Sequence, residues 1–280
     1  MKILLTGGTG FIGSHFLVAA LTAGLEVIAL RRPGRTARLP LPREPQWQEE
    51  AWAALPEEAF AGVDALVHLA AAGVDPATAN WHDCFEVNVH ESLALWLRAR
   101  ACGVERFVIC GTCFEYGNSG ARYEHIPIDA PLEPTGPYHA SKAAATMAAL
   151  GFAVQQKAAV TILRPFHVFG PGEDEKRFWP ALRAAAGAGR DFPMTPGEQV
   201  RDFVPAEEVA ARFLAAARDP SITAGHPAIR HIGTGRPQTL RAFAEHWWRV
   251  WAARGELQFG ALPYRADEVM RYVPEIPDHP

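Results

Sequence analysis

Tyr138 and Lys142 are four residues apart in an alanine-rich segment that begins at Pro137. Proline favours the first turn of a helix and alanine its interior, so both side chains are expected on one helix face, one turn apart. A free phenol has a pKa of about 10, and a neighbouring ammonium group lowers that pKa by stabilising the phenolate. The pair is therefore suited to move a proton to or from a substrate oxygen. Because this spacing also arises in helices without function, it needs a second indication of chemistry.

A glycine-rich segment at residues 6–13, TGGTGFIG, supplies that indication because it lies between a predicted strand and a predicted helix. Gly7 permits a tight turn, Gly10 lets the backbone approach a pyrophosphate, and Gly13 lets the helix pack closely on the strand. The free N–H groups at the start of the helix favour the negative charge of a dinucleotide. The alternative is a glycine turn without a ligand. The residues expected to contact the cofactor here are Gly7, Thr9, Gly10, Phe11, Ile12 and Gly13.

Two arginines, Arg31 and Arg32, follow the second apolar run, where an NAD-binding site usually has a carboxylate for the ribose hydroxyls. A guanidinium group is suited instead to a 2′-phosphate, which it can bind with two parallel hydrogen bonds. Arg35 adds positive charge nearby. The sequence therefore predicts NADP(H) in preference to NAD(H), with NAD(H) still possible. The alternative reading of these arginines is a solvated basic loop.

The elements that must position these residues alternate between strand and helix. The first thirty residues read as a strand over 2–6, a glycine turn, a helix over 14–22 and a strand over 26–30, which is one βαβ unit. Further strands are predicted at 65–69, 106–110 and 160–163, with helices at 87–101 and after Pro137. Such alternation predicts a parallel sheet with helices on both faces.

Past residue 167 the pattern changes to loops rich in glycine and proline, with helices predicted near 180–188 and 205–217 and a strand near 230–232. We therefore expect a dinucleotide-binding domain over 1–166, with a return strand near 200–235, and a smaller substrate-binding lobe over 167–280. The stretch 31–56 is rich in proline and arginine and is predicted to be irregular.

Composition limits the other classes of function. A formal net charge of -4, from 27 basic and 31 acidic side chains, gives neither the positive electrostatic field that attracts nucleic acid nor a basic patch that binds a membrane. Neither a signal-peptide pattern nor an apolar run long enough to span a bilayer is present, so a cytoplasmic location is expected. The four cysteines lack paired metal-binding spacing, so no metal site is predicted.

Thr112 follows the predicted strand 106–110, at the edge where open parallel sheets bind their ligands. Its hydroxyl is suited to bind the reacting oxygen of a substrate, although a threonine at a strand end is often only a turn or cap residue.

Taken together, the motifs resemble those of the extended short-chain dehydrogenase/reductases, the NAD-dependent epimerase/dehydratase group that acts on nucleotide sugars. The resemblance covers nearly the whole chain. In order, the motifs are TGGTGFIG at 6–13, DALVHLAA at 64–71, Asn88 opening a helix, GTCFEYG at 111–117, YHASK at 138–142, LRPFHVFGPG at 163–172, RDFV at 201–204 and HIGTG at 231–235.

The resemblance implies a Rossmann-type doubly wound parallel sheet, with Thr112, Tyr138 and Lys142 as the catalytic triad and Tyr138 as the general acid or base. It implies further cofactor contacts outside the glycine turn. These are Leu69, Ala70 and Ala71, the helix-opening Asn88, and the segment from Pro165 to Val168, which holds the nicotinamide amide.

Departures from the family pattern narrow the reaction. Dehydratases of this family have an Asp-Glu pair after the catalytic threonine, and this chain has Cys113 and Phe114, so dehydration is not expected. Glu115, one residue further on, would face the other way if the segment is extended. The resemblance also places three side chains at the substrate: Phe114, His167, where relatives often have asparagine, and Arg201, on a substrate diphosphate.

Structural roles are the alternatives to substrate binding for two of these side chains. The alternative for His167 is a packed histidine, which is the commoner role, and the alternative for Arg201 is a surface ion pair with Asp202 or Glu198. His231 also replaces a common asparagine, and its role is open.

Three functions are compatible with these residues. The first is NADPH-dependent reduction of a nucleotide-linked 4-keto-deoxysugar, because cells keep NADP mostly reduced. The second is a nucleotide-sugar 4-epimerase, which oxidises and then reduces the same carbon without net turnover of the cofactor. The third is a dinucleotide sensor without catalysis, a class that often lacks the reactive tyrosine or lysine that this chain retains.

The resemblance also predicts a homodimer, because similar enzymes pair the two helices at 87–101 and 138–155 across a four-helix interface. The first helix carries Leu93, Trp96 and Leu97, and the second carries many alanines, which allow close packing. Burial of these residues within one subunit is the alternative.

Overall fold

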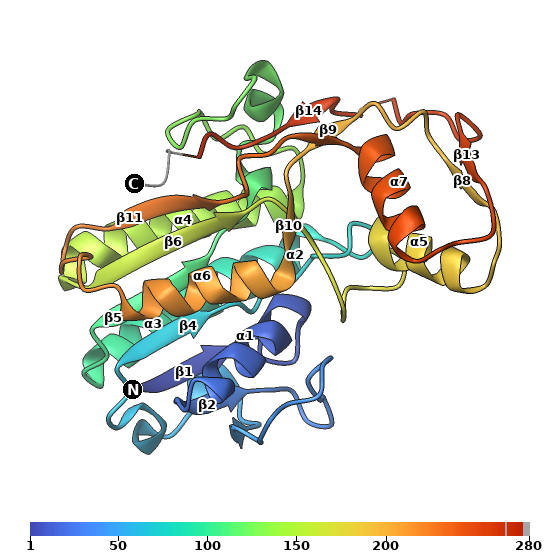
Figure 1. Ribbon diagram of the computed structural model, residues 1–280. Coiled ribbons are helices and arrows are strands. Elements are labelled where there is room, and N and C mark those ends of the chain that lie inside the picture. The colour runs from blue at the N-terminus through green and yellow to red at the C-terminus, as the bar shows by residue number, and fades with distance from the viewer. Residues whose placement is uncertain (267, 277–280) are drawn as a thin grey trace.

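The main element is a seven-stranded parallel sheet, seen edge to edge in Figure 1. The computed structural model describes residues 1–266 and 268–276. From one edge to the other, the strands are β11 (Ala228–Ile232), β6 (Ala159–Pro165), β5 (Arg106–Cys110), β4 (Ala65–His68), β1 (Lys2–Thr6), β2 (Glu26–Leu30) and β3 (Gln46–Gln48). Because the strands are parallel, all their carboxyl ends lie at one edge of the sheet, and this edge holds the site.

The central strands are continuous apolar runs because both faces of the sheet are covered. Residues 3–6 of β1 and every residue of β4 and β6 are buried. The strand order, with crossovers on both sides of β1, confirms the predicted doubly wound α/β fold.

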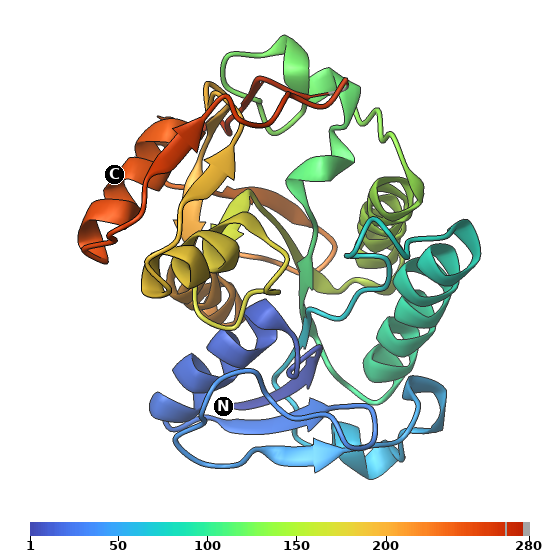
Figure 2. The same ribbon diagram turned by 90° about the vertical axis from the view of Figure 1, so that its right-hand side faces the viewer.

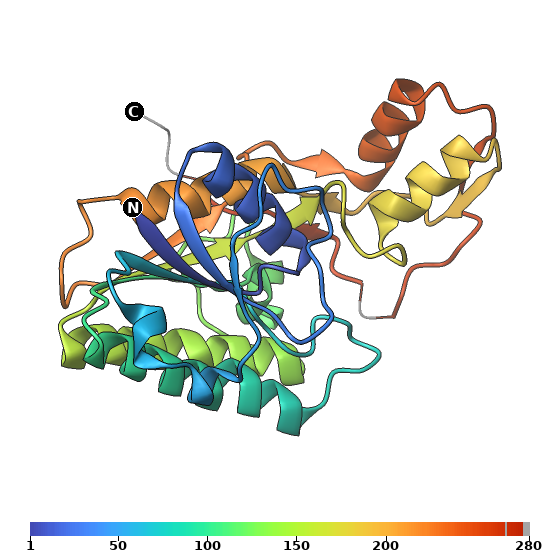
Figure 3. The same ribbon diagram turned by 90° about the horizontal axis from the view of Figure 1, so that it is seen from below.

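Helices cover both faces, and Figure 3 shows the sheet between the two layers. Helices α1 (Phe11–Thr22) and α6 (Ala206–Arg218) pack against each other on one face. The other face is covered by α2 (Trp81–Phe85), α3 (Ser92–Ala101) and α4 (Pro137–Gln156). A π-helical turn over Glu86–Glu91 joins α2 to α3.

Each layer has its own apolar core. On the first face, Phe16 of α1 and Phe213 of α6 are fully buried with the inner side chains of β1. On the second face, the ring of Phe152 lies edge-on to Phe107 and near Trp96. These contacts fix the distance of α4 from the sheet, and α4 carries Tyr138 and Lys142 at its amino-terminal end.

A small lobe projects to the right of the sheet in Figure 1. It consists of α5 (Phe178–Gly187), α7 (Leu240–Val250) and the paired strands β8 (Phe192–Met194) and β13 (Leu257–Phe259). Aromatic rings hold it together, since Trp179 contacts Trp247 and Trp251 at ring-centroid distances of 5.6 Å.

Short strands connect this lobe to the edge of the sheet. Strand β7 (His167–Phe169) pairs with β10 (Phe203–Pro205), and β9 (Val200–Arg201) pairs with β12 (Gln238–Thr239) and β14 (Arg271–Tyr272). Four short 3-10 helices, η1 (Trp52–Ala54), η2 (Glu57–Phe60), η4 (Cys113–Glu115) and η5 (Asn118–Arg122), complete the named elements. Figure 2 shows the last described residues beside the turns at 113–122.

The structure differs from the sequence expectations in three places. The segment 31–56, predicted to be irregular, contributes the edge strand β3 and the turn η1. The helix predicted from Val87 begins earlier, at Trp81, where the side chain of Asn80 caps the first turn. Helix α1 begins at Phe11, directly after the glycine turn.

No helix among the described residues is long and apolar enough to cross a membrane.

Candidate active site

The glycine turn is packed too closely to admit side chains. Gly7 has a φ of +74°, and a Cβ there would lie 2.6 Å from the amide nitrogen of Ala70. A Cβ on Gly13 would lie 2.0 Å from the carbonyl oxygen of Gly7. The glycines therefore bring α1 against the turn between β1 and α1, as the sequence predicted for Gly7 and Gly13.

The amino-terminal end of α1 fits the pyrophosphate of a dinucleotide. Its first residue follows Gly10, no side chain caps this end, and no acidic residue lies in the first turn. Helix N–H groups and the helix dipole therefore face the carboxyl edge of the sheet, where open α/β sheets bind their ligands in a crevice, without a competing anion from the first turn. Thr9 and Phe11 are partly exposed at this position, whereas Ile12 packs partly against the core.

The floor of the crevice is a buried hydrogen-bond chain between β1 and β4. Nδ1 of His68 lies 3.0 Å from the hydroxyl of Thr6, and its Nε2 lies 2.9 Å from the hydroxyl of Ser92. Burial lowers the pKa of His68 to about 3, so the ring is neutral. The Thr6 hydroxyl also accepts the N–H of Ala70. This chain fixes the start of the predicted cofactor segment, whose residues Leu69, Ala70 and Ala71 are all partly exposed.

Asn88 lies behind that segment. Its side-chain oxygen accepts the N–H of Ala72 at 2.7 Å, and its amide donates to the Ala72 carbonyl and to the hydroxyl of Ser141. Asn88 is buried. Its role in the structure is therefore to join the crevice wall to α4.

The two arginines predicted to bind a 2′-phosphate differ in environment. Arg31 donates to Glu49 at 2.9 and 2.8 Å and lies over the ring of Trp47. Arg32 is exposed. The Glu49 contact was not foreseen because it depends on β3 pairing with β2.

Thr112 caps the 3-10 turn that follows β5. Its hydroxyl accepts the N–H of Phe114 at 3.3 Å, and its own N–H donates to the carboxylate of Glu115 at 2.8 Å. The two contacts form a capping box, which fixes the Thr112 backbone. The expectation that Glu115 would face away is wrong, because the segment is helical and not extended.

Glu115 is the centre of a buried network that sequence reasoning missed. Its second carboxylate oxygen accepts from the hydroxyl of Thr146 in α4 and from Nε of Arg164 in β6, at 2.8 and 2.9 Å. Arg164 continues to the hydroxyl of Tyr116 at 2.7 Å, and that hydroxyl lies 2.6 Å from Nε2 of His231. The signal in the sequence was the Thr-x-x-Glu spacing of the capping box.

Tyr138 and Lys142 lie at the start of α4, beside this turn. Burial raises the pKa of the Tyr138 phenol well above its usual range, and the nearby Thr112 side chain lowers it only in part. Lys142 is buried and donates to the carbonyl of Cys110 at 2.6 Å. The three predicted catalytic side chains therefore lie at one edge of the sheet, with the phenol protonated at neutral pH.

Four aromatic side chains form a wall next to Thr112, which we call the aromatic wall: Phe114, His139, His167 and Tyr272. The Phe114 ring stacks on His139 at 5.1 Å and on Tyr272 at 6.2 Å, and lies edge-on to His167 at 6.1 Å. Burial lowers the pKa of His167 to about 3, so its ring is neutral. Phe114 and His167 were predicted from the sequence, whereas His139 and Tyr272 were not.

The other predicted contact residues lie in β6, β7 and β9. Pro165 ends β6 and is buried opposite Ile232 of β11, while Val168 in β7 is partly buried against the core. Arg201 pairs with Glu268 at 3.1 Å, and not with Asp202 or Glu198 as the sequence alternative had it.

Asp202 binds elsewhere. Its carboxylate accepts the N–H groups of Thr234 and Gly235, which lie in the HIGTG motif.

A segment between β7 and α5 links the two sides of the glycine turn. The Pro171 carbonyl lies 2.8 Å from Nε2 of His15 in α1, and Arg177 donates to the carbonyl of Val74, beyond β4. Glu173, between them, has a buried carboxylate oxygen without a partner among the described residues, and burial raises its pKa to about 7.

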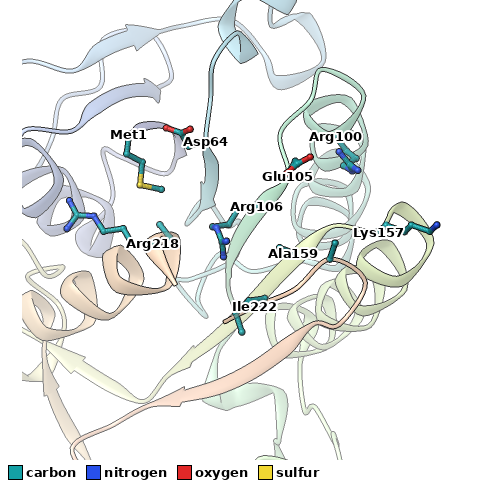
Figure 4. A pocket seen from close by; sticks show the side chains of 11 residues that line it. Met1, Asp64, Arg100, Glu105, Arg106, Lys157, Ala159, Arg218 and Ile222 are labelled. Atoms are coloured by element: carbon teal, nitrogen blue, oxygen red, sulfur yellow. The ribbon is translucent and has the colours of Figure 1, made fainter. Parts of the chain in front are cut away.

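A cavity of about 700 Å³ lies at the opposite edge of the sheet, shown in Figure 4. It is lined by arginines that include Arg100 and Arg106. Arg100 donates to the carbonyl of Gln156 at the end of α4, and Arg106 to the carbonyl of Asp219 just after α6. These two arginines bind carbonyl groups at the ends of α4 and α6, so stabilisation of the helix ends accounts for their presence here.

Comparison with known proteins agrees with this geometry. Residues 3–229 match the model of the NAD dependent epimerase/dehydratase family. A UDP-glucose 4-epimerase of Corynebacterium glutamicum is 29% identical, over 88% of this chain and 79% of that protein. A dTDP-6-deoxy-L-talose 4-dehydrogenase (NAD(+)) of Aggregatibacter actinomycetemcomitans is 25% identical, over 96% of this chain and 98% of that protein.

A solved structure of MoeE5 in complex with UDP-glucose and NAD superposes with a TM-score of 0.81. It is 26% identical and covers 99% of this chain and 90% of that one. The resemblance stated from the motifs is confirmed.

The Glu115 network makes a prediction about stability. Glu115→Gln keeps an oxygen for the Thr112 N–H but leaves Arg164 buried without its counter-charge. We expect the free energy of unfolding to fall by about 3 kcal/mol, measured by urea denaturation at pH 7. Glu133→Gln, which breaks the exposed pair with Arg122, is the control and should change little. Equal losses in the two variants would contradict the role of the buried pair.

Proposed function

Because the chain belongs to the NAD dependent epimerase/dehydratase family, we propose that it reduces the 4-keto group of a nucleotide-linked deoxysugar. Enzymes of this family use a nicotinamide dinucleotide, which, when bound, supplies the hydride. The glycine turn and the uncapped end of α1 provide the binding surface for its pyrophosphate.

Tyr138 donates its phenolic proton to the substrate oxygen in this proposal. Thr112, near Tyr138, orients the same oxygen. Lys142 places a positive charge at the start of α4, where it stabilises the phenolate that remains after proton transfer. The observation that carries the proposal is that Thr112 follows β5, and Tyr138 and Lys142 begin α4, at the same carboxyl edge of the sheet as the glycine turn.

Dehydration is not supported by the residues after Thr112. Burial raises the pKa of the Cys113 thiol to about 12, and Phe114 has no proton to transfer. The nearest carboxylate, Glu115, is already bound by Arg164 and Thr146. Reduction needs only one acid, which Tyr138 would supply, and a hydride donor, which the bound dinucleotide would supply.

The comparisons support two reactions at the same carbon. The 4-dehydrogenase of Aggregatibacter actinomycetemcomitans acts on a deoxysugar and has nearly the length of this chain, which favours the reductase. The 4-epimerase of Corynebacterium glutamicum favours epimerisation as the second candidate. Both reactions use the same acid or base, Tyr138.

We assign the nucleotide end of the substrate to the small lobe. Arg201 lies at the base of this lobe, and its guanidinium is mostly buried beside Glu268. A substrate diphosphate would supply the charge-assisted hydrogen bonds for which a guanidinium is suited.

The preference for NADP(H) is part of the proposal, and Arg32 and Arg35 support it. Both are exposed beyond the end of β2, where a 2′-phosphate would lie. Arg31 supports it less, because Glu49 already binds its guanidinium.

We also propose a homodimer formed by α3 and α4. Leu97, Met147 and Val154 are 40%, 60% and 62% exposed on these helices, so both helices offer apolar side chains to a partner. Trp96 and Leu93, which the sequence suggested for the interface, pack instead into the core of the subunit.

The stoichiometry of the cofactor separates the two reactions. On addition of a nucleotide-linked 4-keto-6-deoxysugar, the absorbance of NADPH should fall by one equivalent for each sugar reduced. Tyr138→Phe should lower kcat/KM by about 100-fold or more, because a general acid is removed. Isomerisation of a nucleotide sugar without net change of the cofactor would favour the epimerase. Unchanged turnover by Tyr138→Phe would exclude Tyr138 as the acid.

Cofactor preference is tested by fluorescence titration with NADPH and NADH. NADPH should bind more tightly, and Arg32→Ala should raise its dissociation constant about tenfold while leaving that of NADH unchanged, because one charge-assisted contact is lost. Arg218→Ala, exposed at the opposite edge of the sheet, is the matched control. Tighter binding of NADH by the wild type would rule out the NADP(H) preference.

The oligomeric state is tested by light scattering at micromolar concentration. The wild type should have twice the mass of the chain, and Met147→Glu should shift it to the monomer because a charge would be buried at the interface. Val250→Glu, at an exposed apolar position in α7, should leave the mass unchanged. A monomeric wild type would exclude the dimer.

A further inference from the structure

Phe114 is unusual because a large apolar ring is exposed next to the candidate catalytic threonine. Its ring is 41% exposed, although its backbone N–H donates to the Thr112 hydroxyl at 3.3 Å. An exposed apolar surface inside a polar site marks a place where a ligand covers it. The ring is therefore available to the substrate within a short distance of the reacting oxygen.

Contacts from three other segments hold the ring in place. His139 follows Tyr138 in α4 and stacks on Phe114 with an interplanar angle of 17°. Tyr272 in β14 also stacks on Phe114, with an interplanar angle of 28°, and His167 in β7 contacts Phe114 edge-on. Because four separate segments form the aromatic wall, its surface is rigid and not an accident of one side chain.

Three polar atoms of the wall are already engaged or covered. The Tyr272 hydroxyl donates to the Cys113 carbonyl at 3.0 Å, and Nδ1 of His139 lies 3.2 Å from the hydroxyl of Thr135. Nδ1 of His167 has no partner among the described residues, but protein atoms cover it. Phe114 itself, which has no polar side-chain atom, therefore presents carbon surface where a substrate hydroxyl would seek a hydrogen bond.

We propose that Phe114 selects substrates that carry a methyl group, in place of a hydroxymethyl group, on the carbon beside the reacting carbonyl. This inference rests on the proposed function, because Thr112 and Tyr138 must hold the carbonyl oxygen for the neighbouring carbon to reach Phe114. A methyl group buries apolar surface against the ring. A hydroxymethyl group loses its water without gaining a partner, so the 6-deoxysugar is preferred.

The test compares two nucleotide sugars with the same base and ring configuration, a 6-deoxyhexose and the parent hexose. Oxidation of each is followed by the appearance of reduced cofactor. The wild type should favour the 6-deoxyhexose in kcat/KM by about tenfold to 100-fold, the range in which an apolar pocket distinguishes an added hydroxyl. Phe114→Ser should reduce this preference about tenfold, whereas Phe114→Leu, which keeps an apolar surface, should retain most of it.

Phe85→Ser is the matched control, because Phe85 in α2 is also a partly exposed phenylalanine, at 38%. It should leave the ratio of the two sugars unchanged. A role for Phe114 in structure alone would lower turnover of both sugars equally and leave their ratio unchanged, which would overturn the inference. So would a wild type that prefers the hexose.

The failure of the proposed reaction is recognised separately. If neither sugar reduces the cofactor, the proposed reaction is wrong. The ratio of the dissociation constants of the two sugars for the cofactor-bound protein, measured by calorimetry, then still tests the wall. An equal ratio in the wild type and Phe114→Ser would exclude Phe114 as the selecting residue.

Discussion

The site depends on one buried carboxylate. Glu115 accepts hydrogen bonds from the turn after β5, from α4 and from β6, and the first two of these segments carry Thr112 and Tyr138. A buried carboxylate is costly unless its oxygens are satisfied and a counter-charge is near. Arg164 meets both conditions, so the two charges define one arrangement of three segments. The candidate catalytic hydroxyls owe their relative position to this arrangement.

The cofactor side of the crevice is built by close packing instead of charge. Gly13 lies directly against the Gly7 carbonyl, and Gly7 against the Ala70 amide, so no larger residue fits at either position. The neutral His68, bound between Thr6 and Ser92, adds no charge beneath the crevice. The uncapped end of α1 is thus the main electrostatic feature that an anionic dinucleotide meets there.

Much of this could be predicted from the sequence because it depends on local patterns. The strands β1, β2 and β5 have the predicted bounds, since continuous apolar runs between turns are typical of buried parallel strands. The glycine turn and the Tyr138 helix were recognised by spacing. Side-chain partners distant in the sequence were not predictable. Arg31 is bound by Glu49 only because β3 pairs with β2, and Tyr272 joins the aromatic wall from the far end of the chain. Glu115 was misjudged because its segment was taken as extended, although Thr112 three residues earlier indicated a capped turn.

The central claim is that the hydroxyls of Thr112 and Tyr138 hold one substrate oxygen beside a dinucleotide bound on α1. A crystal structure with a nicotinamide dinucleotide and a nucleotide sugar bound tests it most directly. The account predicts one sugar oxygen within about 3 Å of both hydroxyls, with the pyrophosphate at the first turn of α1. A sugar bound away from these hydroxyls, or a Tyr138 hydroxyl directed away from the crevice, would contradict it.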